Sequence, residues 1–163
     1  MELICIAKIH TDIKDKFGLP RQSGRVPQLM GRIVFEPGYR NPDYIRGLEQ
    51  YDHIWVIWGF DQLGDEHNNN PTVRPPKLRG NMRVGVFATR SPFRPNSIGL
   101  SSLKIESVNA DGPDGPEIIV SGIDMADGTP LYDIKPYIPY ADSHPDAKGG
   151  FSSEHAEDKL DTT

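Results

Sequence analysis

Residues 98–124 read IGLSSLKIESVNADGPDGPEIIVSGID, and they hold the strand pattern from which we predict the fold. Its first part alternates: Leu103 and Ile105 share one face, and the charged residues that follow each of them share the other. The Gly- and Pro-rich middle, residues 109–116, is typical of a hairpin loop. Residues 117–124 then return as a second apolar strand. The pattern predicts an antiparallel hairpin with one face turned toward a core.

The rest of the chain supplies further short strands. Residues 53–60, HIWVIWGF, are apolar on both alternating faces, which predicts a strand buried on both sides with Trp55 and Trp58 in the core. Asn41, Pro42 and Asp43 are typical of a helix start, because Asn can cap, Pro suits the first helical position and Asp favours the positive helix end. They predict a short helix that ends near Gln50. The other expected strands are residues 2–10, 29–36, 83–88 and 131–140.

The order of these segments predicts a mainly β fold. A parallel sheet needs strands that alternate with long helices, and this alternation is missing. We therefore expect a single β-barrel of about seven mostly antiparallel strands with one or two short helices. The barrel is expected to span residues 1–141, and residues 142–163 to form an acidic, partly mobile C-terminal tail.

Composition limits the class of protein. The 163 residues suit one domain, and 16 Gly and 15 Pro disfavour a helical bundle. No apolar run is long enough to span a membrane, and the start does not read as a signal peptide. Cys5 is the only cysteine, so an intramolecular disulfide is excluded and a reducing cytoplasm is the expected location.

Charge is unevenly distributed. The net charge of −5 argues against a protein that coats nucleic acid indiscriminately. Residues 67–105, however, contain no acidic residue. One interpretation is a solvated face, and the other is a local site for phosphate or carboxylate. The basic residues of this stretch are Arg74, Lys77, Arg79, Arg83, Arg90, Arg94 and Lys104.

Several common sites are absent from the sequence. It has no phosphate-binding P-loop, no G-x-G-x-x-G after the first strand, no H-E-x-x-H and no G-x-S-x-G. The five histidines lack close metal-ligand spacing, so no metal is expected.

The densest candidate site is residues 85–101, GVFATRSPFRPNSIGLS. Pro92 and Pro95 stiffen this loop, which therefore loses little entropy when it binds a ligand. The guanidinium groups of Arg90 and Arg94 suit a carboxylate or phosphate. The alternative is a proline-rich connector with surface arginines.

Two later motifs are open to two interpretations each. The DGTP turn at residues 127–130 would expose backbone amides beside a carboxylate, or it is only a tight turn between strands. In residues 131–137, Asp133 and Lys135 lie on one side of an extended segment, as a functional pair or as a surface ion pair on an edge strand.

These motifs together resemble the TrmO family, also called TsaA-like or VirR-like proteins. The strings that carry the resemblance are PRQ at 20–22, LEQYDHIWVIWGFDQ at 48–62, FATRSPFRPNSIGLS at 87–101 and DGTPLYDIKPYIPYADS at 127–143. The resemblance covers residues 2–143. It implies a single-barrel, S-adenosylmethionine-dependent methyltransferase that forms homodimers. The implied substrate is N6 of threonylcarbamoyl-adenosine beside the anticodon of tRNA.

The resemblance also implies which residues contact the cofactor. Position 61 is Asp where the family often has His, and position 97 is Ser where it usually has Pro. Many bacterial members carry a further C-terminal domain, whereas an acidic tail is expected here. The implied cofactor-binding residues are Pro20, Arg21, Gln22, Asp61, Gln62, Arg90, Leu100, Asp127, Gly128, Thr129 and Pro130.

Chemistry adds a second group of candidates. The attacking N–H must lose its proton, so a general base is needed, and Asp133 and Tyr137 are the predicted catalytic residues. The acid-free stretch would guide the anticodon arm through phosphate contacts. Substrate or RNA contacts are predicted at Arg79, Arg83, Arg94 and Lys135. Two other interpretations stay open: a methyltransferase of the same barrel on another substrate, and a non-enzymatic module that binds the cofactor or RNA.

Overall fold

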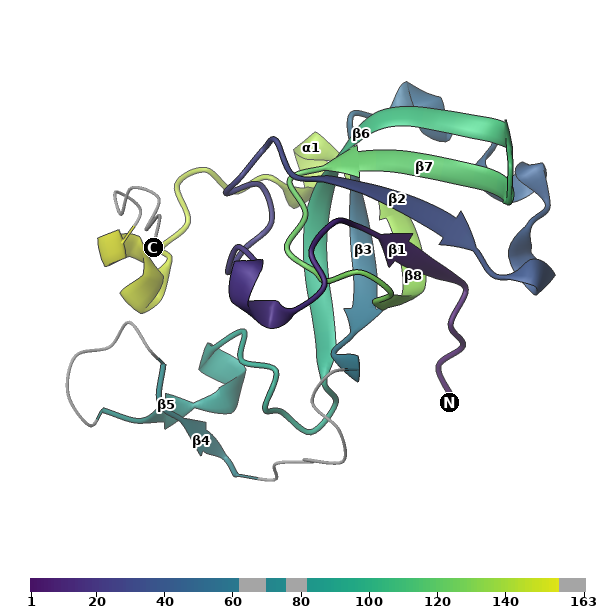
Figure 1. The fold of residues 1–163 in the computed structure, drawn as a ribbon. Helices are drawn as coiled ribbons and strands as arrows, with labels where there is room; N and C mark the ends of the chain where they lie inside the picture. Colours follow the sequence, from purple (N-terminus) through teal and green to yellow (C-terminus); the bar gives the residue numbers. More distant parts are fainter. Residues whose placement is uncertain (62–69, 76–81, 156–163) are drawn as a thin grey trace.

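A computed structural model describes residues 1–61, 70–75 and 82–155. In this part of the chain, six antiparallel strands close into a barrel in the order β1-β2-β7-β6-β3-β8 (Figure 1). This confirms the predicted mainly β barrel. The barrel strands are β1 (Ala7–His10), β2 (Met30–Phe35), β3 (His53–Gly59), β6 (Ile98–Gly112), β7 (Gly115–Ser121) and β8 (Pro130–Pro136).

The remaining described elements are short. A two-stranded ribbon, β4 (Thr72–Val73) and β5 (Val84–Gly85), stands apart from the barrel (Figure 1). One α-helical turn, α1 (Pro139–Asp142), follows β8. The 3-10 helices are η1 (Lys16–Gly18), η2 (Pro37–Tyr39), η3 (Pro42–Ile45), η4 (Leu48–Gln50), η6 (Val86–Ala88) and η7 (Gly150–His155). None of the helices in the described ranges combines the length and apolar character needed to cross a membrane.

The hairpin predicted over residues 98–124 is confirmed, with a shorter loop than expected. The β6–β7 ladder continues from Lys104↔Ser121 to Gly112↔Gly115. Gly115 takes a positive φ of 92°, which permits a tight reversal immediately after Pro113 and Asp114. The Gly and Pro of residues 109–116 therefore mark one turn inside a long hairpin, and the prediction of a loop over all eight residues was wrong.

Two other local predictions needed correction. The Asn41 side chain accepts a hydrogen bond from the Asp43 N–H at 3.0 Å, so the predicted cap is confirmed. The helix it opens is only the 3-10 turn η3, because Gly47 at φ 88° interrupts the segment before η4 begins. The strand expected over residues 83–88 is limited to β5, and the chain then turns into η6.

The barrel interior is apolar and well buried. Ile9, Ile33, Ile54, Leu103 and Ile118 are among the side chains with no solvent exposure. Trp58 belongs to this core, as predicted. Trp55 does not, since it is half-buried on the outer face of β3, so the prediction that both tryptophans pack in the core was wrong for one of them.

The outer face around Trp55 joins the barrel to α1. The Trp55 indole N–H donates to an Asp142 carboxylate oxygen at 2.9 Å, and the Ile138 N–H donates to the same oxygen. The Tyr137 ring lies 5.6 Å from the Trp55 ring, centroid to centroid. These contacts fix the chain at the end of β8. The division into a barrel and a tail at residue 142 stays a prediction.

Candidate functional site

Two of the sequence motifs meet at one end of the barrel. The Arg90 guanidinium donates a hydrogen bond to the Gln22 side-chain oxygen, although 68 residues separate them in the chain. Gln22 lies in the loop between β1 and β2, and Arg90 is exposed in the loop before β6. The contact therefore brings the PRQ motif against the motif at residues 87–101, as the resemblance implies for a shared site.

Backbone contacts hold the PRQ loop in this place. The Gly24 N–H donates to the Gly122 carbonyl at 2.7 Å, at the point where β7 ends. The Ser102 N–H donates to the Ser23 hydroxyl at 3.2 Å, which fixes the loop beside β6. The loop is thus clamped to two strands, and Gln22 faces Arg90 from a defined position.

Hydrogen bonds join three polar side chains next to the loop that holds Gln22. The Trp58 indole N–H donates to the Ser101 hydroxyl at 2.9 Å, and Ser101 donates to Asp124 Oδ1 at 2.6 Å. Trp58 and Ser101 are buried, with 6% and 1% exposure. Since Trp58 can only donate, the Ser101 hydroxyl has its proton free for Asp124.

Burial raises the pKa of the Asp124 carboxyl above its ordinary value. Hydrogen bonds from Ser101 and from the backbone N–H groups of Asp124 and Ser23 act against this rise, as does the Arg90 charge. Buried carboxyls with shifted pKa values beside a cation are typical of functional sites. From the sequence, Asp124 is only the last residue of the strand predicted over 117–124. It was missed as a site residue because an Asp between a strand and a turn has an ordinary structural explanation.

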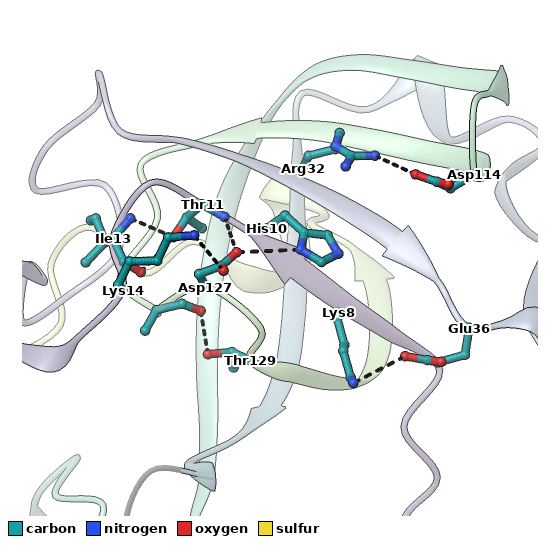
Figure 2. A network of polar contacts seen from close by, with 11 residues as sticks. Lys8, His10, Thr11, Ile13, Lys14, Arg32, Glu36, Asp114, Asp127 and Thr129 are labelled. Carbon is teal, nitrogen blue, oxygen red and sulfur yellow. Dashed lines mark hydrogen bonds and ion pairs between the residues drawn. The ribbon is translucent and has the colours of Figure 1, made fainter.

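The DGTP turn has a different character (Figure 2). Asp127 accepts from the Thr11 N–H and from the Lys14 ammonium, both at 2.9 Å, and its pKa is lowered chiefly by the Lys14 hydrogen bond. The three N–H groups of residues 127–129 donate to the carbonyls of Ile13, Ile9 and Ala126. Of the two interpretations of this turn, the structure therefore supports the tight turn between strands, because these amides are already bonded within the chain.

The remaining predicted cofactor residues are exposed or partly buried, apart from one that lies outside the described residues. Leu100 is 52% exposed on the outer face of β6, next to the buried Ser101. Asp61 is exposed just after β3. Gln62 lies outside the described residues. Pro20 is partly buried and Arg21 exposed in the same loop as Gln22.

The predicted RNA-contacting arginines make local bonds. Arg83 donates to the Thr72 hydroxyl and carbonyl at 2.8 and 2.7 Å, which ties β5 to β4. Arg94 donates to the Thr89 carbonyl at 2.9 Å and so folds its own loop. Arg79 lies outside the described residues. Arg90 differs from these two arginines because its partner is a side chain of another motif.

The predicted catalytic residues both belong to the last barrel strand or follow it directly, Asp133 within β8 and Tyr137 just after its end. Register pairs Asp133 with Ile57 and Ile57 with Leu100, so these side chains form one row across β8, β3 and β6. Asp133 is therefore two strand spacings, about 10 Å, from Leu100. Lys135 pairs with Asp133 at 3.3 Å. Tyr137 lies at the end of β8, between the rings of His53 and Trp55.

Two hollows on the described surface each include a predicted site residue. One, of about 450 Å³, is lined by His10, Lys14, Arg32 and Asp127 among others. The second, of about 570 Å³, is lined by Asp133, by Arg46 and by four tyrosines, Tyr39, Tyr44, Tyr51 and Tyr132, together with apolar side chains. Within the described ranges, His, Cys, Asp and Glu form no group of three that could hold a metal ion.

The fold and the site together define a class of protein. It is a closed antiparallel barrel with a cluster of polar side chains at the strand ends, where loops 20–24 and 85–97 meet Asp124. The model of the tRNA-methyltransferase O N-terminal domain matches residues 8–143, and the chain belongs to this family. The family resemblance inferred from the motifs is thereby confirmed.

Individual relatives support this assignment. The chain is 44% identical over 147 residues to a tRNA (adenine(37)-N6)-methyltransferase of Escherichia coli, covering 90% of this chain and 62% of that protein. It is 30% identical over 152 residues to a probable S-adenosyl-L-methionine-binding protein of Pyrococcus abyssi, covering 91% and 76%. A crystal structure of TrmO superposes with a TM-score of 0.74 at 37% identity, covering 92% of this chain and 63% of that one. The chain thus spans about three fifths of the length of its bacterial methyltransferase relatives.

Proposed function

We propose that this chain is an S-adenosylmethionine-dependent methyltransferase that acts on N6 of the threonylcarbamoyl-adenosine beside the anticodon of tRNA. The observation that carries the proposal is the Gln22–Arg90 contact, which joins two cofactor motifs on one barrel end. The names of the relatives support the same activity, since several are tRNA (adenine(37)-N6)-methyltransferases. A homodimer in the cytoplasm is part of this proposal.

The residues present suit the cofactor. Its amino-acid end carries a carboxylate and an ammonium group, and an exposed Arg90 beside a largely buried Asp124 offers the two opposite charges. Its adenosine needs apolar surface, and Leu100 and Ile98 are exposed large apolar side chains on β6. We assign Pro20–Gln22, Arg90 and Leu100 to the cofactor site, and cofactor contacts of Asp127–Pro130 stay predictions from the motif. Asp61 and Gln62 stay predictions from the motif.

S-adenosylmethionine would supply an electrophilic methyl group. The chain's own task is to hold the target nitrogen in line with that group and to take its proton. Asp133 is the proposed base, because its carboxylate lies in the Leu100 row and has Lys135 beside it to stabilise its charge. Tyr137 is the second candidate, at the end of the same strand.

The acid-free stretch is the proposed guide for the RNA. Arg83 and Arg94 donate hydrogen bonds to Thr72 and Thr89. A guanidinium has five N–H donors, so each arginine keeps further donors and its charge for a phosphate. Contacts from these arginines, from Arg79 and from Lys135 to phosphates would make binding depend on salt.

Methyl transfer to defined tRNA tests the proposal. We expect transfer to tRNA that carries threonylcarbamoyl-adenosine and none to the same tRNA without this modification. Asp133→Asn should lower the single-turnover rate about 100-fold or more while cofactor binding is retained. Transfer to another RNA would indicate the same barrel with a different substrate, and cofactor binding without transfer to any RNA would contradict the enzyme assignment.

A further inference from the structure

Asp124 combines two properties that a purely structural carboxylate seldom has. It is largely buried, and no Lys, Arg or His within the described residues lies within 4.0 Å of it as an ion-pair partner. Asp127, only three residues further on, has Lys14 at 2.9 Å and His10 at 3.5 Å. Burying a charge without an ion pair costs free energy of folding, so the presence of this carboxylate calls for a functional explanation.

Asp124 is also held ready as an acceptor. Ser101 directs its proton to Oδ1 because Trp58 occupies the other side of that hydroxyl. The chain therefore fixes both the position and the hydrogen-bonding direction of the carboxylate. Preorganisation of this kind favours a ligand donor that arrives with its own positive charge.

The neighbouring cation gives the ligand its second charge. Arg90 is close enough for its charge to act on Asp124, yet its guanidinium bonds to Gln22 and is exposed. A cation and an anion whose charges act on each other without forming an ion pair suit an α-amino acid, whose carboxylate and ammonium groups lie on one carbon atom. A lone phosphate would gain from Arg90 and be repelled by Asp124.

We propose that Asp124 binds the α-ammonium group at the amino-acid end of the cofactor, opposite Arg90, which binds the α-carboxylate. This assignment rests on the proposed function, because it names a further residue of the same site. It makes Asp124 a specificity residue: ligands with the free amine are preferred over ligands that lack it.

Calorimetric titrations with three ligands test the assignment. S-adenosylmethionine and S-adenosylhomocysteine carry the amine, whereas 5′-methylthioadenosine lacks the whole amino-acid end. In Asp124→Asn we expect about 10- to 100-fold weaker binding of the first two and an unchanged affinity for the third. Asp12→Asn, which neutralises an exposed aspartate in the loop after β1, is the matched control and should bind all three ligands as the original chain does.

The other outcomes overturn the assignment in different ways. Equal weakening of all three ligands would mean that Asp124 only holds the loops. Weakening for S-adenosylmethionine alone would place the carboxylate at the sulfonium. If the original chain binds none of the three, the proposed function itself fails. Circular dichroism checks the fold of each variant, and Asp124→Ser replaces Asp124→Asn if the latter does not fold.

Discussion

Asp124 and Asp127 lie in the same connection between β7 and β8, and their carboxylates meet opposite surroundings. Both residues are partly exposed, but Lys14 and the Thr11 N–H stabilise the charge of Asp127 (Figure 2). For Asp124, burial is the main influence and raises the pKa of its carboxyl, while Ser101, itself bonded to Trp58, fixes its orientation. The difference indicates that the DGTP turn is a structural support, and that Asp124, three residues before it, is the carboxylate left available to a ligand.

The largest effect on stability is expected at Ser101. Replacing it with alanine leaves the buried Trp58 N–H without its acceptor, which should lower the free energy of unfolding by about 1–3 kcal/mol. Ser102→Ala is the matched control, because Ser102 is only partly buried on the outer face, and we expect a loss below about 0.5 kcal/mol. Urea unfolding of both variants measures the difference. Equal losses in the free energy of unfolding would mean that the hydrogen bonds from Trp58 to Ser101 and from Ser101 to Asp124 do not stabilise this end of the barrel.

A smaller loss is expected at Asp127. Asp127→Asn removes the charge that Lys14 and Thr11 stabilise, and because the carboxylate is near the surface the cost at neutral pH should be about 1 kcal/mol. The lowered pKa sets the pH dependence: the stabilisation is present above the unfolded-state value near 4 and is lost as pH falls through the native pKa. Unfolding curves from pH 2 to 7 should converge for the two chains at the acid end. A difference in the free energy of unfolding that stays constant from pH 2 to 7 would contradict an electrostatic origin in the Asp127 charge.

The smallest effect, and the opposite sign, is expected at Asp124. Its raised pKa means that the original chain loses stability as pH rises through the unfolded-state value and then the native one. Asp124→Asn removes that loss and can still accept from Ser101, so at pH 7 it should be at least as stable as the original chain. The same pH series measures this. A variant that is less stable at pH 7 and recovers in acid would show that Asp124 is stabilised as an anion before any ligand binds.

Much of the fold follows from local patterns. The alternation around Leu103, the cap at Asn41 and the apolar strand at 53–60 all predicted elements that the structure contains. The errors have physical causes. Trp55 and Trp58 lie on opposite faces of β3, and only tertiary packing decides that Asp142 of α1 contacts the one outside the barrel.

The site was predictable only in part. Gln22 and Arg90 were identified through motifs, and the structure brings them together. Asp124 could not be identified, because its importance depends on burial and on Ser101, 23 residues earlier in the chain. The bonded amides of the DGTP turn likewise depend on β1 and the loop after it, which no local pattern reveals.

The most direct test of the account compares cofactor binding by Arg90→Ala and Lys14→Ala. Both variants remove one exposed cation that bonds to a side chain, Arg90 to Gln22 and Lys14 to Asp127. We predict that titration with S-adenosylmethionine shows about 10- to 100-fold weaker binding for Arg90→Ala and an affinity within about twofold of the original chain for Lys14→Ala. Equal affinities in the two variants, or the reverse order, would contradict the placement of the cofactor at the Arg90 end.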